Sequence, residues 1–150
     1  MFRIASIRLL FLAFLLAGTR IIAFAQGVDA IERGLWYDED KTAKIQIFKA
    51  GDGKYYGKIV WLKVPERDGH TKIDINNPDK SHRNDPILGM ELLKNFKKTD
   101  DNEYEDGTIY DPTSGKTYSC KMNLKGDRLD VRGYIGFSMI GHTTRWTRTE

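Results

Sequence analysis

The sequence predicts an all-β domain, a small antiparallel barrel of about eight strands with one long ordered loop. From Gly34 onward apolar residues recur with a period of two, which is the pattern of half-buried strands. Turn residues interrupt this pattern at intervals of roughly 8 to 14 residues, and no amphipathic helix lies between them. Closure into a barrel would remove exposed strand edges. A sandwich of two sheets is the alternative that the same pattern allows.

The first strands are predicted from alternation and a glycine-containing turn. A strand opens at Gly34-Leu35-Trp36, and residues 44–47 alternate polar and apolar side chains before a second alternating segment at 55–62. The connection 49–54 contains two glycines, which accept the positive φ angles of tight turns. We therefore expect a hairpin between these two segments.

The later strands follow the same logic. Ile109-Tyr110 leads into the turn Asp111-Pro112-Thr113-Ser114-Gly115, whose residue types suit a tight turn. Residues 117–124 and 129–135 alternate on either side of the turn Lys125-Gly126-Asp127. The last strand is predicted at 142–148. In contrast, residues 64–88 show neither period, and their Asn-Pro and Asp-Pro turns and apolar anchors predict a long, ordered loop.

The N-terminal segment has the pattern of a cleaved secretory signal. Arg3 and Arg8 precede an apolar run, residues 9–17, and the small-x-small sequence Ala23-Phe24-Ala25 follows. Residues 18–20 interrupt the run before it reaches the length that spans a bilayer. We expect removal of residues 1–25, a single mature domain at 26–150, no stable membrane anchor, and a periplasmic or secreted location.

Charge argues against nucleic-acid binding. The chain has 24 Lys and Arg against 21 Asp and Glu, and the three basic residues of the signal account for the excess. A near-neutral mature domain lacks the basic surface that phosphate binding requires. We expect no nucleic-acid partner.

The residue types that most often act in catalysis or metal binding, such as cysteine, histidine and aspartate, have structural interpretations in this sequence. Cys120 alternates with apolar residues on a predicted strand, so we expect a buried core thiol. The three histidines are scattered, and the calcium-like start Asp74-x-Asn76 is not followed by the remaining ligands of such a loop. We therefore predict no metal, no cofactor and no catalytic residue.

The two ends of the domain resemble the lipocalin-type barrel. In that barrel a Trp of a Gly-x-Trp motif plugs one end, and an Arg near the last strand stacks on it. The matching residues are Gly34, Trp36, Arg145, Trp146 and Arg148. The resemblance implies structural roles for all five.

A resemblance to a family of small exported bacterial proteins of unknown function, with lipocalin-like (calycin-type) barrels, covers nearly the whole mature chain. It implies a barrel and brings no established catalytic residues. The segments that carry it are residues 34–36, 56–61, 74–79 with Arg83, 86–89, 107–112, 115–118, 131–136 and 146–148.

Polar residues of the long loop are candidates for a cluster at the barrel mouth. We expect Asp74, Asn77, Asp79 and Arg83 to form hydrogen bonds that fix the loop or contact a ligand, with an Asp79–Arg83 pair among them. Arg132 would join this cluster as a ligand anchor only if its side chain points into the barrel. Its orientation is left open by the sequence.

Two functions remain open, and an enzyme is the least favoured because no catalytic signature is present. The first is a non-catalytic binding protein that encloses a small hydrophobic or amphipathic ligand. The second is a filled barrel that acts as a protein-interaction or envelope-structural module, with an envelope protein as its partner. The candidate interior residues are Tyr55, Ile59, Trp61, Tyr118, Met122, Val131, Ile135 and Phe137.

Overall fold

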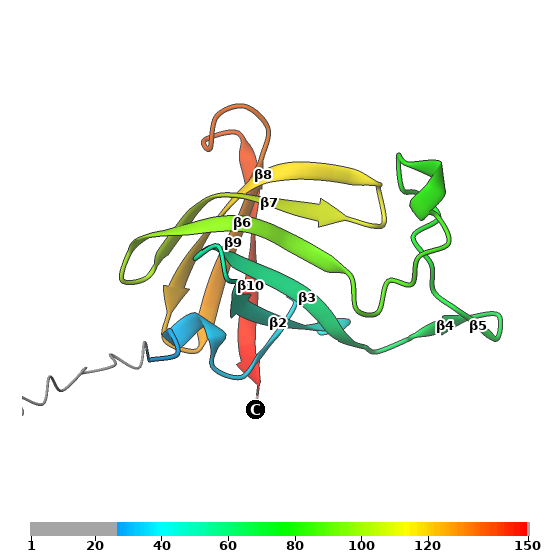
Figure 1. Cartoon of the computed structure of the whole chain (residues 1–150), viewed down its shortest axis with the longest axis horizontal. Helices are drawn as coiled ribbons and strands as arrows, with labels where there is room; N and C mark the ends of the chain where they lie inside the picture. Colours follow the sequence, from blue (N-terminus) through cyan, green and yellow to red (C-terminus); the bar gives the residue numbers. More distant parts are fainter. Residues whose placement is uncertain (1–26, 150) are drawn as a thin grey trace, which may run out of the picture.

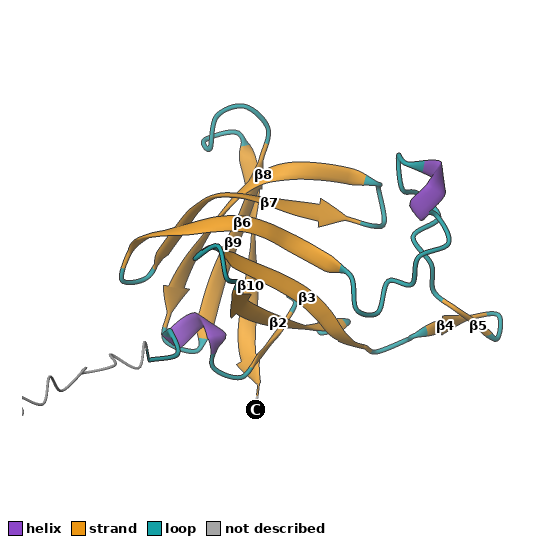
Figure 2. Cartoon of the chain, viewed as in Figure 1, coloured by secondary structure: helices purple, strands orange, loops and turns teal. Residues whose placement is uncertain are grey.

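Eight antiparallel strands close into one barrel (Figures 1 and 2), in the order β1-β10-β9-β8-β7-β6-β3-β2. The structure is a computed structural model that describes residues 27–149, so the predicted signal lies outside the described residues. Closure confirms the predicted fold class and excludes the sandwich. The elements are η1 (Ala30–Glu32), β1 (Leu35–Tyr37), β2 (Ala43–Lys49), β3 (Tyr55–Leu62), β4 (Glu66–Arg67), β5 (His70–Thr71), η2 (Lys80–His82), β6 (Glu91–Asp100), β7 (Glu103–Asp111), β8 (Lys116–Lys125), β9 (Arg128–Tyr134) and β10 (Gly141–Thr149).

The strand directions give the barrel two different ends. The β1–β2 turn, the long loop at residues 63–90, the β7–β8 turn and the β9–β10 loop all lie at one end, called the open end here. The 3-10 helix η1 lies at the opposite end, at the lower left of the barrel in Figure 2. The long loop extends beyond the barrel and carries the β4–β5 ribbon and η2 (Figure 1).

Side chains fill the half of the barrel near η1. The rings of Tyr55 and Tyr104 meet edge to face, with centroids 4.9 Å apart. The Phe96 ring lies over Gly107 so closely that a Cβ added there would be 2.4 Å from the ring. Cys120 is also buried, as predicted, and burial raises the pKa of its thiol to about 12.

Strand β6 is the element that alternation did not reveal. Leu92 and Leu93 are consecutive buried residues, and Asn95 has a φ of 67°. On the neighbouring strand Asp106 has a φ of 59°, where the β7–β8 register shifts. These irregularities break the period of two, so residues 91–106 do not resemble a regular strand in sequence.

A β-bulge also corrects the predicted position of Trp61. Lys44 pairs with Trp61 but Ile45 pairs with Ile59, so β3 has one extra residue at this point. The extra residue rotates Trp61 to the outer face, where its ring meets Tyr37 edge to face at 6.0 Å and Lys44 lies over both rings. Trp61 is 38% exposed, and the prediction that it lines the interior is wrong.

Trp36 and Arg148 close the end of the barrel that carries η1. The Trp36 indole is fully buried and donates to the Ile31 carbonyl, 2.8 Å away. The Arg148 guanidinium lies 4.3 Å from the centre of the indole ring and donates to the carbonyls of Ala30, Arg33 and Gly126. One guanidinium therefore joins η1, β1 and the β8–β9 turn.

The other residues assigned to the closure divide into two groups. Gly34 has a φ of 73° and Trp146 is buried in the core, as a structural role requires. Arg145 has an exposed side chain on the strand position next to buried Trp146. Because neighbouring residues of a strand face opposite sides, Arg145 points outward, and its predicted place in the closure is wrong.

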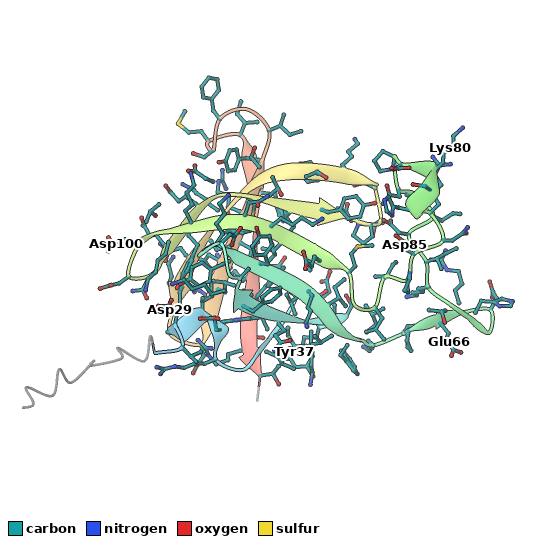
Figure 3. All side chains as sticks on the ribbon, in the orientation of Figure 1. Asp29, Tyr37, Glu66, Lys80, Asp85 and Asp100 are labelled. Carbon is teal, nitrogen blue, oxygen red and sulfur yellow. The ribbon has the colours of Figure 1, made fainter. Side chains whose placement is uncertain are left out.

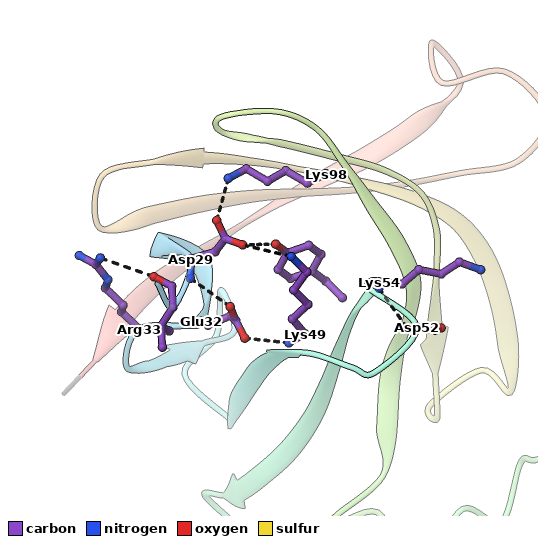
Figure 4. Close-up of polar contacts among 9 residues, drawn as sticks. Asp29, Glu32, Arg33, Lys49, Asp52, Lys54 and Lys98 are labelled. Atoms are coloured by element: carbon purple, nitrogen blue, oxygen red, sulfur yellow. Dashed lines mark hydrogen bonds and ion pairs between the residues drawn. The ribbon is translucent and has the colours of Figure 1, made fainter. Parts of the chain in front are cut away.

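Asp29 ties η1 to the barrel wall (Figure 4). Its carboxylate accepts from Lys98, at 2.7 Å, and from the Tyr55 hydroxyl. The Lys98 hydrogen bond, followed by that of Tyr55, holds the pKa of Asp29 below its usual range. Glu32 completes a capping box by accepting from the Asp29 amide.

Candidate functional site

A cleft of about 630 Å³ lies at the open end, between the long loop and the wall formed by β6, β7 and β8. Leu93 and Ile109 pair with each other and face the core. The alternate residues of the same strands therefore face outward, so this cleft lies beside the barrel rather than inside it. Its strand residues are Glu91, Leu92, Lys94, Thr108, Tyr110 and Thr117.

The β7–β8 turn anchors the long loop. The side-chain amide of Asn76 donates to the Thr113 carbonyl at 2.8 Å. Gly115 has a φ of 69°, and the Asn76 carbonyl oxygen lies 2.0 Å from the position that a Cβ would occupy there. Only glycine fits this turn beside the loop. The predicted turn at 111–115 therefore also positions one wall of the cleft.

Asp74 is the buried carboxylate of the cleft. Its side chain accepts from the Tyr110 hydroxyl at 2.8 Å and from the Asn77 amide at 2.7 Å, and its backbone amide donates to the Asp85 carbonyl. Burial and the hydrogen bond to Asp74 raise the pKa of Tyr110 to about 12. The predicted Asp74–Asn77 contact is therefore present, and Tyr110 connects it to the barrel wall.

The predicted Asp79–Arg83 pair does not form within residues 27–149. Asp79 instead caps η2, accepting from the backbone and hydroxyl of Ser81 at 2.9 and 2.7 Å. Arg83 donates to the Asn77 carbonyl at 2.8 Å. Both residues fix the loop, as expected, but each does so through a different partner.

His82 takes the position that sequence reasoning gave to Arg83. Its Nδ1 lies 2.7 Å from a carboxylate oxygen of Asp85, and its Nε2 lies 3.9 Å from Asp79. The hydrogen bond with Asp85, and then the charges of Asp85 and Asp79, raise the pKa of His82. Protonated His82 therefore links the two ends of the segment around η2.

The cleft combines apolar and polar walls. Leu88, Met90 and Leu92 form an aliphatic surface, and Pro78 and Pro86 extend it along the loop. Hydroxyl groups and charged groups of both signs surround this surface: Thr108, Tyr110, Thr117, Asp74, Asp85, Glu91, His82 and Lys94. A ligand that fits both walls has an apolar part and a hydrogen-bonding head.

The residues predicted to line the interior lie in different places in the structure. Tyr55, Ile59, Met122 and Val131 are buried in the packed core. Tyr118 is half-buried and packs beside Gly133. The predictions for Ile135 and Phe137 are wrong, because these side chains are 70% and 78% exposed in the β9–β10 loop. Strand β9 ends at Tyr134, so the alternation that would place Ile135 and Phe137 inside the barrel does not continue into the loop.

The structure decides the orientation of Arg132. Leu129 and Val131 are buried, so Arg132 points to the outer face. Its guanidinium donates to the carbonyls of Ser138 and Met139 and to the Thr143 hydroxyl. Arg132 holds the β9–β10 loop and lies away from the cleft, so it does not join the Asp74 cluster.

Sequence reasoning missed the cleft residues that come from the long loop, from β6 and from the outer face of β7 and β8. The positions on the loop and on β6 have no period of two, and the mixed side chains of the whole set carry no recognisable motif. A weak signal was available in His82 and Asp85, a histidine and a carboxylate three residues apart. The missed residues are His82, Asp85, Leu88, Met90, Glu91, Leu92, Lys94, Thr108, Tyr110 and Thr117.

Residues 34–148 match a protein family described as "Uncharacterized protein conserved in bacteria (DUF2147)". A search of curated proteins found no match. A solved structure titled "Protein HP1028 from the human pathogen Helicobacter pylori belongs to the lipocalin family" is similar, with a TM-score of 0.68 and 22% identity. The similarity covers 78% of this chain and 82% of that chain. At this identity it shows the lipocalin-like fold alone.

Proposed function

We propose that this chain, which belongs to the DUF2147 family of bacterial proteins, is an exported, non-catalytic binding protein for a small amphipathic ligand. The observation that carries the proposal is the cleft of about 630 Å³ with an aliphatic surface and a buried carboxylate in its wall. Its volume and mixed lining are those of sites for small organic molecules. The lipocalin-like fold supports binding as the general function.

The ligand would lie beside the barrel, with its apolar part on Leu88, Met90 and Leu92. Its head would reach the hydroxyls of Thr108 and Tyr110, which lie on the same wall. Asp74 already accepts two hydrogen bonds, so it orients Tyr110 and Asn77 rather than binding the head alone. This division of roles gives a preorganised site with little cost of ordering on binding.

Export is part of the proposal. Removal of residues 1–25 would start the mature chain at Gln26, directly before the described barrel. The compartment would be the periplasm or the exterior of the cell. The intact mass of the purified protein tests this step, because cleavage after Ala25 and retention of the segment give different masses.

The ligand is tested by native mass spectrometry of protein purified from its own cell envelope, followed by extraction of bound molecules. We expect a stoichiometric amphipathic molecule, and uptake of a fluorescent fatty-acid probe by the emptied protein. Leu88→Arg should abolish uptake by filling the cleft. Val64→Arg is the matched control, since Val64 is 54% exposed, Leu88 is 43% exposed, and only Leu88 lines the cleft.

Two results would contradict the proposal. One is a protein that carries no ligand and takes up no probe, and the other is equal uptake by the two arginine variants. The first result would favour the second candidate function, an envelope protein that binds a protein partner, whereas the second would place the bound probe outside the cleft. The filled core around Phe96 and Gly107 is the observation in favour of that alternative.

A further inference from the structure

The β9–β10 loop exposes four large apolar side chains within six residues. Ile135, Phe137, Met139 and Ile140 are 70%, 78%, 88% and 71% exposed, respectively, and are together called the apolar tip. The loop projects past the end of the barrel (Figure 1), and its side chains point away from the strands in several directions (Figure 3). A soluble surface rarely concentrates so much apolar side chain at one protruding point without a binding role.

The backbone of the same loop is hydrogen-bonded internally. Ile140 donates to the Phe137 carbonyl at 3.0 Å, and Ile135 donates to the Ile140 carbonyl at 3.4 Å. Arg132 donates to the two carbonyls between them, those of Ser138 and Met139, at 2.7 and 3.1 Å. The four consecutive carbonyls 137–140 are therefore all satisfied. A loop that enters an apolar phase needs this, because an unsatisfied carbonyl there costs several kcal/mol.

The segment that carries the apolar tip contains basic side chains and no acidic ones. No Asp or Glu occurs in residues 131–149, although the chain has 21 of them. The three described hydrogen bonds of Arg132 go to neutral oxygens, and Lys121 is its partner on β8. Glu105 and Asp130 line the same hollow of the outer wall as Arg132, and Asp130 is paired with Lys125 and Arg128. The Glu39 carboxylate contacts β10 only further along, at the Arg145 amide. An anionic surface is the complement of this region.

From these observations we propose that the apolar tip inserts into the headgroup region of an anionic lipid bilayer and docks the barrel there by its open end. A fluid bilayer adapts to a convex tip with diverging side chains. A protein partner or a second copy would need roughly 800 Å² of contact on each side for a stable interface, and a six-residue loop supplies much less. Apolar insertion together with basic flanks is how peripheral proteins bind such surfaces.

The test is co-sedimentation of the processed protein with vesicles of phosphatidylethanolamine and phosphatidylglycerol. We expect binding, and we expect the double variant Phe137→Ser, Met139→Ser to bind at least about tenfold more weakly, because each lost side chain removes apolar area from the bilayer. Ile75→Ser is the matched control, since Ile75 is 56% exposed on the long loop and should have no effect. Equal thermal unfolding of the three proteins checks that the variants fold.

A second measurement reports the position of the loop directly. Phe137→Trp should show a blue-shifted tryptophan emission when these vesicles are added, relative to the wild-type protein. The proposal is wrong if the wild-type protein stays in the supernatant, or if the double variant sediments like wild type. It is also wrong if sedimentation velocity shows that the double substitution dissolves a wild-type dimer, which would assign the apolar tip to a second copy.

Discussion

At the residue scale, two arginines near the C-terminus have different roles although they are three positions apart. Arg148 lies over Trp36 and donates to carbonyls of η1, of its C-cap and of the β8–β9 turn, whereas the side chain of Arg145 is exposed on the outer face. A guanidinium offers five donors in a fixed plane, which suits the site of Arg148. The strand periodicity, rather than residue type, decides which arginine closes the barrel.

Arg148→Met should lower the free energy of unfolding by roughly 2 kcal/mol, because it removes the contact with Trp36 and leaves carbonyls without donors. Arg145→Met is the control and should change it by less than about 0.5 kcal/mol. Urea unfolding of both variants gives these values. Binding of the fatty-acid probe should stay unchanged in folded Arg148→Met, since the closure lies at the opposite end from the cleft. Loss of binding without loss of stability would show that the closure has a functional role.

At the element scale, the long loop is held by local contacts that depend on pH. His82 bridges Asp85 and Asp79 only while it is protonated, and its pKa is raised in the folded state. Below the unfolded pKa of about 6.5 the stabilising contribution is fully present. It is lost as the pH rises through the higher folded pKa. The loop should therefore loosen as the pH rises through the folded pKa of His82.

Hydrogen exchange measures this loosening. We expect protection of the amides of Asp85 and Ile87, which donate to His82 and Lys72, to fall as the pH rises through the folded pKa of His82, after correction for intrinsic exchange. His82→Asn should remove this pH dependence. His70→Asn, which changes an exposed histidine on β5, should retain it. The same pH profile in wild type and in His82→Asn would mean that another group controls the loop.

At the scale of the whole molecule, apolar side chains pack in the barrel interior, and the cleft lies outside the barrel. Gly57 and Gly107 make room for the side chains of Leu93 and Phe96, which lie on the neighbouring strand β6. Interiors packed in this way tolerate little added volume. A ligand therefore reaches the protein from the side of the open end, between the long loop and β6–β8.

Gly107→Ala tests the filled interior. The new methyl would overlap the Phe96 ring, so we expect the free energy of unfolding to fall by about 1–3 kcal/mol. Gly51→Ala is the control, because nothing lies within 4 Å of its added Cβ and its φ is negative. Both values come from urea unfolding monitored by circular dichroism. Equal stability of the two variants would indicate free space beside Phe96, as in a hollow barrel.

Much of this architecture is determined by the sequence itself. Alternation with a period of two, interrupted by turns such as 111–115, is local information, and it predicts most of the strands, the antiparallel order and the closed barrel. The closure by Trp36 and Arg148 follows from the resemblance of the first and last strands to the lipocalin-type barrel. The loop at 64–88 is also recognisable, because neither periodicity occurs there.

Only the tertiary structure decides which side chains meet. One bulged residue in β3 turns Trp61 outward. Two residues with left-handed backbone, Asn95 on β6 and Asp106 on β7, interrupt the period of two in these strands. In the long loop Asp79 lies near His82 and Arg83 donates to Asn77, in place of the expected Asp79–Arg83 pair. The folded position of each side chain, rather than its place in the sequence, decides its partner. A period of two identifies a regular strand but does not locate a bulge within it. The cleft and the apolar tip depend instead on bulges and loop closure, which are non-local.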